Sequence, residues 1–269
     1  MSHRMMWGRR GDGSPLPQNY SGLKLWYDAS DADTLFDAVS GGSPVVTNGS
    51  PVARWEDKSG NGLHLTQATS GQRPTLNVAA KNGLDALNFD GVNDSMTTGV
   101  QDIMRNVGSA YIFTVCQDTN PTGGDSNHFI SILTSGGNSR WINYTRWNNN
   151  NVFRAATRRL PSDSLSSAAF SSDGNYNTHG TRLRFFGGGA AYSINQRIPV
   201  ELFSPTTGNT SDIPGEFEIG GLGTTGSLPG NICELILLED PASATDPDAD
   251  VIFLNCIFSY LQNKWAITP

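Results

Sequence analysis

The sequence predicts an all-β protein: a sandwich of two antiparallel sheets with an extended N-terminal arm and one C-terminal amphipathic helix. Of its 269 residues, 30 are glycine and 14 are proline, and only 16% are charged. Long charged helices need many Glu, Lys, Ala and Leu residues, so this composition disfavours them. Short segments of alternating apolar and polar residues recur between clusters of turn formers. Together these observations indicate many short strands in a sandwich.

The first element, residues 1–21, is expected to be an arm outside the sandwich. It shows no period of 2 or 3.6, and its arginines are not followed by the apolar stretch of a signal peptide. A purely solvating tail would lack methionine and tryptophan, so we expect the arm to anchor the protein to a partner. The alternative is a disordered terminus. The predicted anchoring residues are Arg4, Met6, Trp7, Arg9 and Arg10.

The body, residues 22–269, is predicted as a single domain of short strands. The first strand begins at Leu23, where residues 23–28 alternate before a turn cluster, and runs such as residues 57–62 separate later strands. Two tryptophans, Trp26 and Trp55, are expected in the core. The other predicted strands are at residues 63–67, 86–89, 110–117, 129–134, 141–145, 151–157, 181–186, 191–195, 216–220 and 232–239.

One segment, about residues 247–265, is predicted as a helix. Asp246 can cap it, Pro247 suits its first position, and Lys264 lies in the last turn, where a cation is favoured. Apolar residues recur at spacings of three and four, which predicts a stripe that packs on the sandwich. The stripe consists of Val251, Leu254, Phe258, Leu261 and Trp265.

Several blocks of sequence carry a resemblance to a known fold family. They are residues 25–31, 54–62, 87–94, 217–221 and 230–237, followed by the closing helix. In this order and spacing they resemble the concanavalin A-like (laminin G-like) jelly-roll modules of phage tail and other virion proteins and of bacterial surface proteins. The resemblance covers about residues 22–267 and implies a concanavalin A-like jelly roll. Because this fold hosts lectins, hydrolases and structural domains alike, function must be argued from sites.

The sequence gives little support for catalysis. Glucanases of this architecture place paired carboxylates on one strand, and here Glu216 and Glu218 alternate on a predicted strand. The acidic residue that would complete the glucanase pattern is missing, and the four histidines are scattered. We therefore expect no catalytic residues and no enzymatic activity, with a glycoside hydrolase as a minor alternative.

Two other kinds of site are considered. Asp28, Asp31 and Asp33 are the best candidates for a Ca²⁺ ion, which needs six to eight oxygens; the alternative is a solvated acidic turn. The three cysteines, Cys116, Cys233 and Cys256, are far apart and are interpreted as buried free thiols.

A glycan site is predicted in residues 140–151, where aromatic side chains alternate with amides. On a strand, Trp141, Asn143 and Trp147 share one face, so rings and amides could bind a sugar together. The alternative places Trp141 in the core and the asparagines in a loop. The predicted glycan-binding residues are Trp141, Asn143, Trp147 and Asn149.

The charge and hydropathy exclude some partners and favour others. The net charge of −7 gives no footprint for nucleic acid, and no apolar run is long enough to span a membrane. We expect a multicopy or homo-oligomeric protein on a virion surface, made in the host cytoplasm, that contacts other virion proteins and a host surface glycan. It would be a capsid decoration or a tail-associated protein. The alternative is a free lectin or a receptor-binding adhesin.

Overall fold

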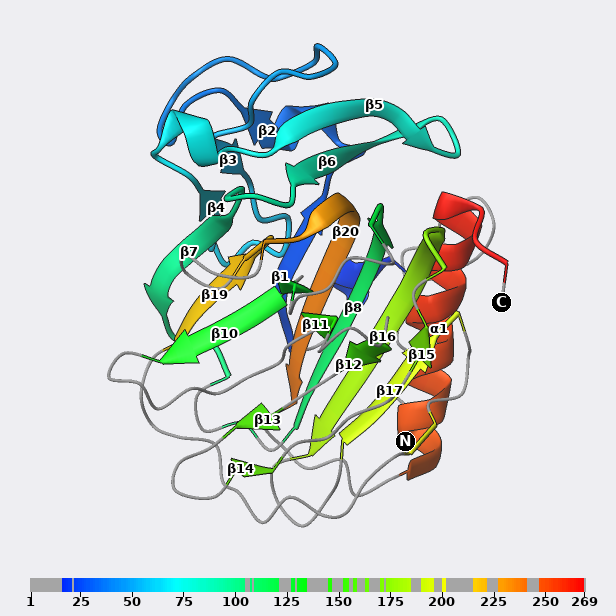
Figure 1. Ribbon diagram of the computed structural model, residues 1–269. Helices are drawn as coiled ribbons and strands as arrows, with labels where there is room; N and C mark the ends of the chain where they lie inside the picture. The colour runs from blue at the N-terminus through cyan, green and yellow to red at the C-terminus, as the bar shows by residue number, and fades with distance from the viewer. Residues whose placement is uncertain are drawn as a thin grey trace.

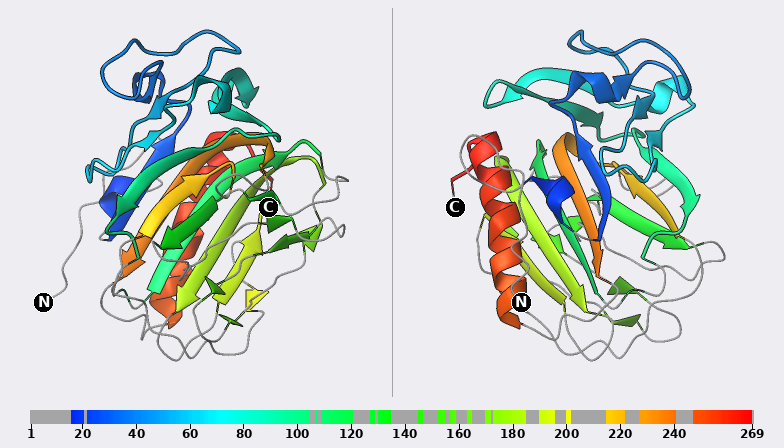
Figure 2. Two further views of the ribbon diagram at one scale, coloured as in Figure 1. Left: turned by 60° about the vertical axis from the view of Figure 1, so that its left-hand side comes forward. Right: turned by 180° about the vertical axis from the view of Figure 1, so that it is seen from behind.

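The computed structural model has three layers: a six-stranded sheet, an eight-stranded sheet and a helix (Figures 1 and 2). All strand pairings are antiparallel among the described residues. The predicted all-β sandwich with one C-terminal helix is therefore confirmed. The structure describes residues 16–20, 22–104, 107, 109–120, 127–128, 130–134, 145–146, 152–154, 157–158, 163–164, 170–171, 173–184, 190–195, 200–201, 215–221, 227–240 and 247–268.

The eight-stranded sheet has the order β18-β17-β16-β8-β20-β6-β5, and β1 pairs with the second half of β20. Strand β20 is central, because β8 pairs with it along one edge and β6 and β1 share the other. Its strands are β1 (Leu23–Asp28), β5 (Thr75–Lys81), β6 (Leu84–Asp90), β8 (Ser109–Asp118), β16 (Tyr176–Arg184), β17 (Ala190–Ile194), β18 (Val200–Glu201) and β20 (Pro229–Asp240).

The six-stranded sheet has the order β10-β19-β7-β4-β3-β2, and smaller sheets and three short 3₁₀ helices complete the described elements. Its strands are β2 (Leu35–Phe36), β3 (Arg54–Trp55), β4 (Leu65–Thr66), β7 (Met96–Gln101), β10 (Ile130–Thr134) and β19 (Gly215–Ile219). The smaller sheets contain β9 (Asn127–His128), β11 (Thr145–Arg146), β12 (Val152–Arg154), β15 (Phe170–Ser171), β13 (Thr157–Arg158) and β14 (Asp163–Ser164). The 3₁₀ helices are η1 (Pro17–Asn19), η2 (Ala32–Thr34) and η3 (Ser70–Gln72).

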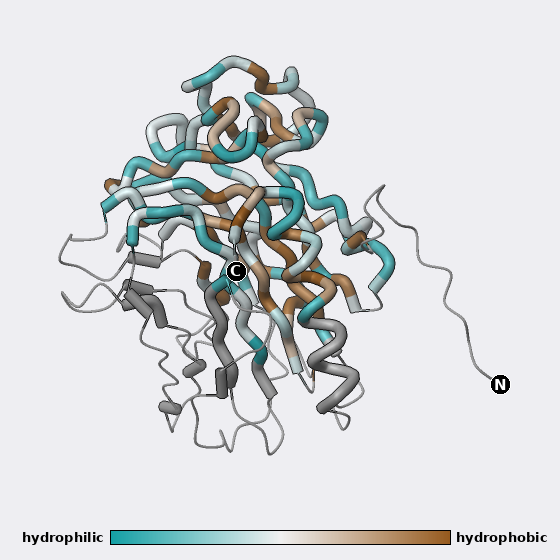
Figure 3. Tube along the Cα trace, turned by 90° about the vertical axis from the view of Figure 1, so that its right-hand side faces the viewer, coloured by the Kyte–Doolittle hydropathy of each residue, from teal (hydrophilic) through white to brown (hydrophobic). Residues whose placement is uncertain are grey.

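The eight-stranded sheet is buried on both faces, as strand β1 illustrates. Leu25 and Tyr27 belong to the cluster between the two sheets, whereas Trp26 belongs to the cluster beneath the helix. Alternate side chains point to opposite faces of a strand, so consecutive buried residues mean that both faces are covered. Figure 3 shows the hydrophobic segments gathered where strands and helix meet. The expected core positions of Trp26 and Trp55 are confirmed.

Helix α1 (Pro247–Trp265) has the predicted bounds and lies against one face of the eight-stranded sheet (Figure 2). Phe258, Leu261 and Trp265 are buried there, as the apolar stripe predicts. Lys264 lies in the last turn as predicted, and there it is buried and ion-paired. Within the described residues, no helix is long and apolar enough to cross a membrane.

The residues just before β1 pack with the body. Pro17 and Tyr20 are buried, and Leu16 lies against the cluster beneath the helix. These three residues of the segment predicted as the arm therefore pack with the body. The described residues include all three cysteines, which are free; Cys116 and Cys233 are buried as expected, but Cys256 is only half-buried.

Candidate functional site

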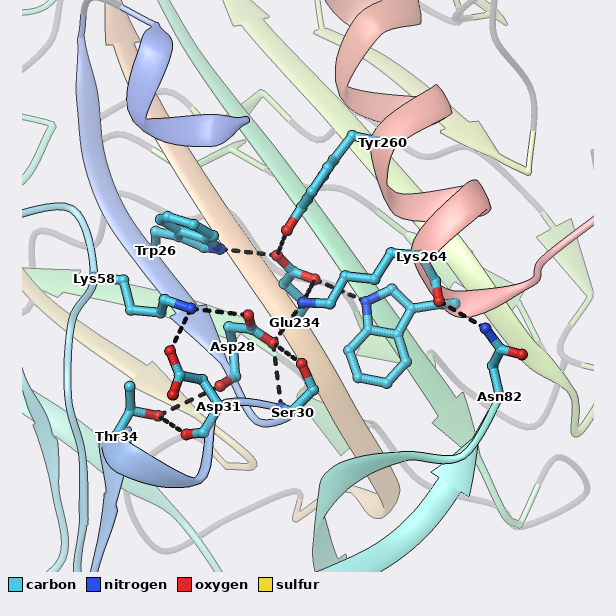
Figure 4. A network of polar contacts seen from close by, with 11 residues as sticks. Trp26, Asp28, Ser30, Asp31, Thr34, Lys58, Asn82, Glu234, Tyr260 and Lys264 are labelled. Atoms are coloured by element: carbon cyan, nitrogen blue, oxygen red, sulfur yellow. Dashed lines mark hydrogen bonds and ion pairs between the residues drawn. The ribbon is translucent and has the colours of Figure 1, made fainter. Parts of the chain in front are cut away.

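A buried carboxylate joins the helix to the eight-stranded sheet (Figure 4). Glu234 of β20 is fully buried and accepts four hydrogen bonds. Its Oε1 accepts from Trp26 Nε1 and from the Tyr260 hydroxyl, both at 2.8 Å. Its Oε2 accepts from Lys264 Nζ at 2.7 Å and from Trp265 Nε1 at 2.8 Å. Because its four donors come from strand and helix alike, the carboxylate holds the two elements together.

The network continues through Asp28 to the edge of the sheet. Lys264 Nζ lies 2.6 Å from Asp28 Oδ1, and Lys58 Nζ lies 3.0 Å from Asp28 Oδ2 and 2.6 Å from Asp31 Oδ2. Burial alone would raise the pKa of Asp28, but the two lysines outweigh burial and hold this pKa below its usual value. Two ammonium groups thus offset most of the charge of three carboxylates, which is the behaviour of a structural network.

These contacts correct the expected calcium site at Asp28, Asp31 and Asp33. Asp28 and Asp31 face lysine ammonium groups, and Asp33 is exposed on η2. Calcium needs six to eight oxygen ligands, whereas the first two carboxylates already pair with lysine ammonium groups. Among the described residues no group of three His, Cys, Asp or Glu side chains could hold a metal ion. The geometry replaces the expected cation with lysines.

The turn run at residues 57–62 has a structural role. The Asp57 carboxylate accepts from the Trp26 backbone N–H at 3.0 Å, and Lys58 N–H donates to the Trp26 carbonyl at 2.7 Å. Asn61 Nδ2 donates to the Leu23 carbonyl at 2.9 Å. These bonds satisfy the edge of β1 that faces away from β20. Residues 57–62, which are part of one block of the family resemblance, therefore stabilise the edge of β1.

A row of polar side chains crosses four adjacent strands on the helix-side face of the eight-stranded sheet. Asn88 of β6 lies opposite Asn231 of β20, which lies opposite Gln117 of β8, which lies opposite Tyr176 of β16. Directly opposed residues on neighbouring strands share one face of the sheet. We call these four residues the amide row.

Hydrogen bonds join the side chains of the amide row. Asn231 Nδ2 donates to Gln117 Oε1 at 2.8 Å, and Asn231 Oδ1 accepts from Asn88 Nδ2 at 3.2 Å. A fourth amide, that of Asn77 in β5 beside the row, donates to the same Asn231 Oδ1 at 3.0 Å. Asn231 is buried, whereas Asn77, Asn88 and Gln117 are half-buried. The row therefore presents to solvent amides whose donors and acceptors are only partly used.

An aromatic ring and a cation lie at one end of the amide row. Tyr176 is half-buried against the cluster beneath the helix, and Lys81 Nζ lies 6.0 Å from the centre of its ring. Lys81 stands at the end of β5, in a hairpin whose Asn82 donates from Nδ2 to the Lys264 carbonyl at 2.9 Å. The hairpin crosses the top of the molecule in Figure 1, with its tip toward α1. Amides, ring and cation thus meet on one face.

Glu216 and Glu218 of β19 share the outer face of the six-stranded sheet, since Phe217 and Ile219 between and beyond them face the core. Glu216 is half-buried and accepts from Thr97 Oγ1 at 2.6 Å, and Glu218 is 6% exposed. The predicted alternation of the two carboxylates is confirmed.

The remaining predicted site residues lie outside the described residues. The anchoring residues Arg4, Met6, Trp7, Arg9 and Arg10 belong to this group, as do the glycan candidates Trp141, Asn143, Trp147 and Asn149. Both sets stay predictions.

The fold and the amide row define a class: a β-sandwich with one buried polar network and one half-exposed polar face. No protein-family profile matches the chain, and no curated protein matches its sequence. Solved structures share the fold. A sialidase from Trypanosoma rangeli in complex with 2,3-difluoro-KDN superposes with a TM-score of 0.51 and 13% identity over 98% of this chain and 36% of the sialidase.

A GH54 α-L-arabinofuranosidase soaked with a cyclic sulfate inhibitor superposes with a TM-score of 0.55 and 15% identity, over 91% of this chain and 60% of that protein. The chain thus spans about a third of the sialidase and three fifths of the arabinofuranosidase. At such identity the likeness shows the fold.

These neighbours correct the expectation that the protein is not an enzyme. Both are glycosidases by name, so proteins that contain this fold include enzymes. The absence of the complete glucanase pattern around Glu216 and Glu218 is therefore no ground for excluding catalysis, because sequence motifs of one family do not define the chemistry of a fold.

Sequence reasoning missed the amide row and the Glu234 network. Asn88 and Asn231 lie in two of the blocks that carry the family resemblance, but a block does not show which residue lies opposite which. Strand register depends on tertiary pairing. The available signal was a polar residue within an otherwise apolar strand, as at Glu234.

Proposed function

We propose that this chain is a carbohydrate-binding β-sandwich protein and that the amide row is its binding face. The observation that carries the proposal is the cross-strand register that aligns Asn88, Asn231 and Gln117 with the ring of Tyr176. Amides donate to and accept from sugar hydroxyls, and an aromatic ring packs on the apolar face of a sugar. The two neighbours described above, solved with sugar derivatives or an inhibitor, support the same class of ligand.

The row is flat and only half-exposed, so one site would bind weakly. We expect a few hydrogen bonds and one stacked ring to give a dissociation constant on the order of millimolar, which is a binding free energy of about −4 kcal/mol. Display in many copies would raise the avidity by 10² or more, a rough estimate for linked sites. Weak single sites therefore fit a multicopy protein.

The test is titration of oligosaccharides into the full chain, followed by ligand-observed NMR. Asn77→Ala and Tyr176→Ala should each weaken binding several-fold, because they remove an amide and the ring from the face. Gln67→Ala is the matched control, because it removes a half-buried amide that does not belong to this face. Gln67 Nε2 donates to the Ser95 carbonyl at 2.9 Å. Wild-type affinity in both Asn77→Ala and Tyr176→Ala would contradict the proposal. Loss in Trp147→Ala alone would move the site to the segment at residues 140–151.

We also propose that the protein is displayed on a virion surface through its arm. What supports this is the composition of residues 1–15, where arginines accompany methionine and tryptophan, and the gain that weak glycan sites draw from multivalency. Other virion proteins would be the partners of the arm. The concanavalin A-like resemblance to virion modules favours the same placement.

A second candidate function is hydrolysis of a glycosidic bond, favoured by the two carboxylates that β19 places on one face. Paired carboxylates are the usual machinery for this reaction. Assays with aryl glycosides would test it: turnover in the wild type should fall by about 10²-fold or more in Glu218→Gln. Turnover that survives both Glu216→Gln and Glu218→Gln would remove these residues from the reaction.

A further inference from the structure

Lys81 differs from the other described lysines in having no carboxylate partner. Lys24 Nζ lies 3.7 Å from Glu239, Lys58 lies 3.0 Å from Asp28, and Lys264 lies 2.7 Å from Glu234. Within the described part of the chain, no carboxylate oxygen lies within ion-pair distance of Lys81. A half-buried ammonium group that has no carboxylate partner within the protein can pair with an anion from solution.

The residues around Lys81 do not supply a counter-charge. The ring of Tyr176, whose centre lies 6.0 Å from Lys81 Nζ, carries no charge, and the side chains of the amide row beyond it are neutral. Asp85 of the same hairpin accepts instead from the Ala79 backbone N–H at 2.9 Å. The ammonium group therefore stands beside the proposed sugar face with its charge uncompensated.

We infer that the amide row takes an acidic saccharide, whose anionic substituent pairs with Lys81 while its ring packs against Tyr176. This inference rests on the proposed carbohydrate-binding function and names its ligand class. The substituent is a carboxylate or a sulfate, because a lysine ammonium binds either as a point charge. The hydroxyls of the neighbouring sugar units would meet the half-buried amides of Asn77 and Asn88.

The overall charge of the protein makes the binding of an acidic saccharide depend on Lys81. The protein carries a net charge of −7, so an acidic saccharide is repelled by the molecule as a whole unless a local cation attracts it. A contact at this half-exposed position is screened by salt. Binding of an acidic ligand should therefore weaken with ionic strength, and binding of a neutral ligand should not.

The test compares three ligands on the full chain: oligogalacturonic acid, its carboxyl-reduced neutral form and a sulfated galacto-oligosaccharide. At low salt the wild type should bind an acidic ligand about tenfold more tightly than the neutral one, the strength of one charge-assisted hydrogen bond. Lys81→Gln should reduce this preference to less than about twofold and leave neutral binding unchanged, and Lys81→Arg should keep it. Comparison of the carboxylate and sulfate ligands identifies the substituent.

Lys24→Gln is the matched control, because it makes the same charge change at a lysine that already has a partner, Glu239. It should leave the preference intact. If the wild type binds neutral and acidic forms equally, the inference is overturned while the proposed function stands. If no saccharide binds the wild type, the proposed function fails as well. A preference that survives Lys81→Gln would overturn the role of Lys81.

Discussion

His179 of β16 makes stability depend on pH, because it is buried without charge. Burial lowers the pKa of His179 to about 3, although Asp173 acts in the opposite direction. In the unfolded chain an ordinary histidine has a pKa of about 6.5. The unfolded state therefore binds a proton at a pH where the folded state does not. Stability from this residue is fully present above pH 6.5 and is lost as the pH falls toward 3.

We expect the free energy of unfolding to decrease between about pH 6.5 and 4, by at most roughly 1.4 kcal/mol per pH unit from this histidine. His179→Gln should flatten the dependence. Urea denaturation of both proteins across this range measures it. Asp94, whose pKa burial raises to about 6, acts with the opposite sign, but it is present in both proteins and cancels in the comparison. Parallel curves would contradict the prediction.

Because Lys264 is part of the Glu234 network, we expect its substitution to lower the free energy of unfolding strongly. Lys264→Met would leave two buried carboxylates, Glu234 and Asp28, without their shared cation. Removing one partner from a buried ion pair costs about 3–5 kcal/mol, and we expect a loss of this size in urea denaturation. Lys24→Met is the control: the Lys24 side chain is 23% exposed and lies 3.7 Å from Glu239, which keeps its bond from the Met104 backbone N–H, so a loss of only about 1 kcal/mol is expected. If both variants lose the same unfolding free energy, the buried network adds no more stability than the Lys24–Glu239 pair.

At the scale of elements, Gly180 sets how closely α1 approaches the sheet. A Cβ atom at Gly180 would lie 2.5 Å from Cζ of Phe258 in the helix and 3.3 Å from Phe113 in β8. The Phe113 and Phe258 rings meet edge to face with centroids 5.4 Å apart. The missing side chain at Gly180 therefore leaves the space that the Phe258 ring occupies.

Gly180→Ala should destabilise the protein by about 1–3 kcal/mol, since overpacking would displace Phe258 and with it the helix. Gly71→Ala is the matched control, because a Cβ atom there meets nothing within 4 Å and its backbone is not in the left-handed region. Thermal unfolding of the two variants gives the comparison. A loss confined to Gly71→Ala, or absent from both, would mean that the helix adjusts freely.

Elements could be predicted well where one local pattern decides them. Residues 23–28 form β1 as expected, and α1 has its predicted bounds because cap, proline and apolar stripe agree. Strands β5 and β7 were missed, because the alternation in Thr75–Lys81 ends after Val78 and Met96–Gln101 contains Gly99. The amide row could not be predicted, since it exists only in the register among distant strands.

At the scale of the whole molecule, the boundary between arm and body has a measurable position. Pro17 and Tyr20 are buried, and Leu16 packs against the cluster beneath the helix. The sequence of residues 1–15 shows no period of 2 or 3.6, so we expect this part of the chain to lie outside the sandwich. The body should therefore fold without residues 1–15 but should need residues 16–20.

Deletion of residues 1–15 should leave the unfolding temperature within about 2 °C of the wild type, less than roughly 1 kcal/mol for a domain of this size. Deletion of residues 1–20 should lower it further, because it also removes Tyr20 and the 3₁₀ turn η1 from the helix-side cluster. Calorimetry of both truncations measures the difference. The variant that lacks residues 1–15 tests the arm separately from folding. If the arm anchors the protein, this folded variant no longer joins its particle in a sedimentation assay. Full assembly of that variant would show that the partner binds the body, and equal unfolding temperatures of the two truncations would place the boundary after residue 20.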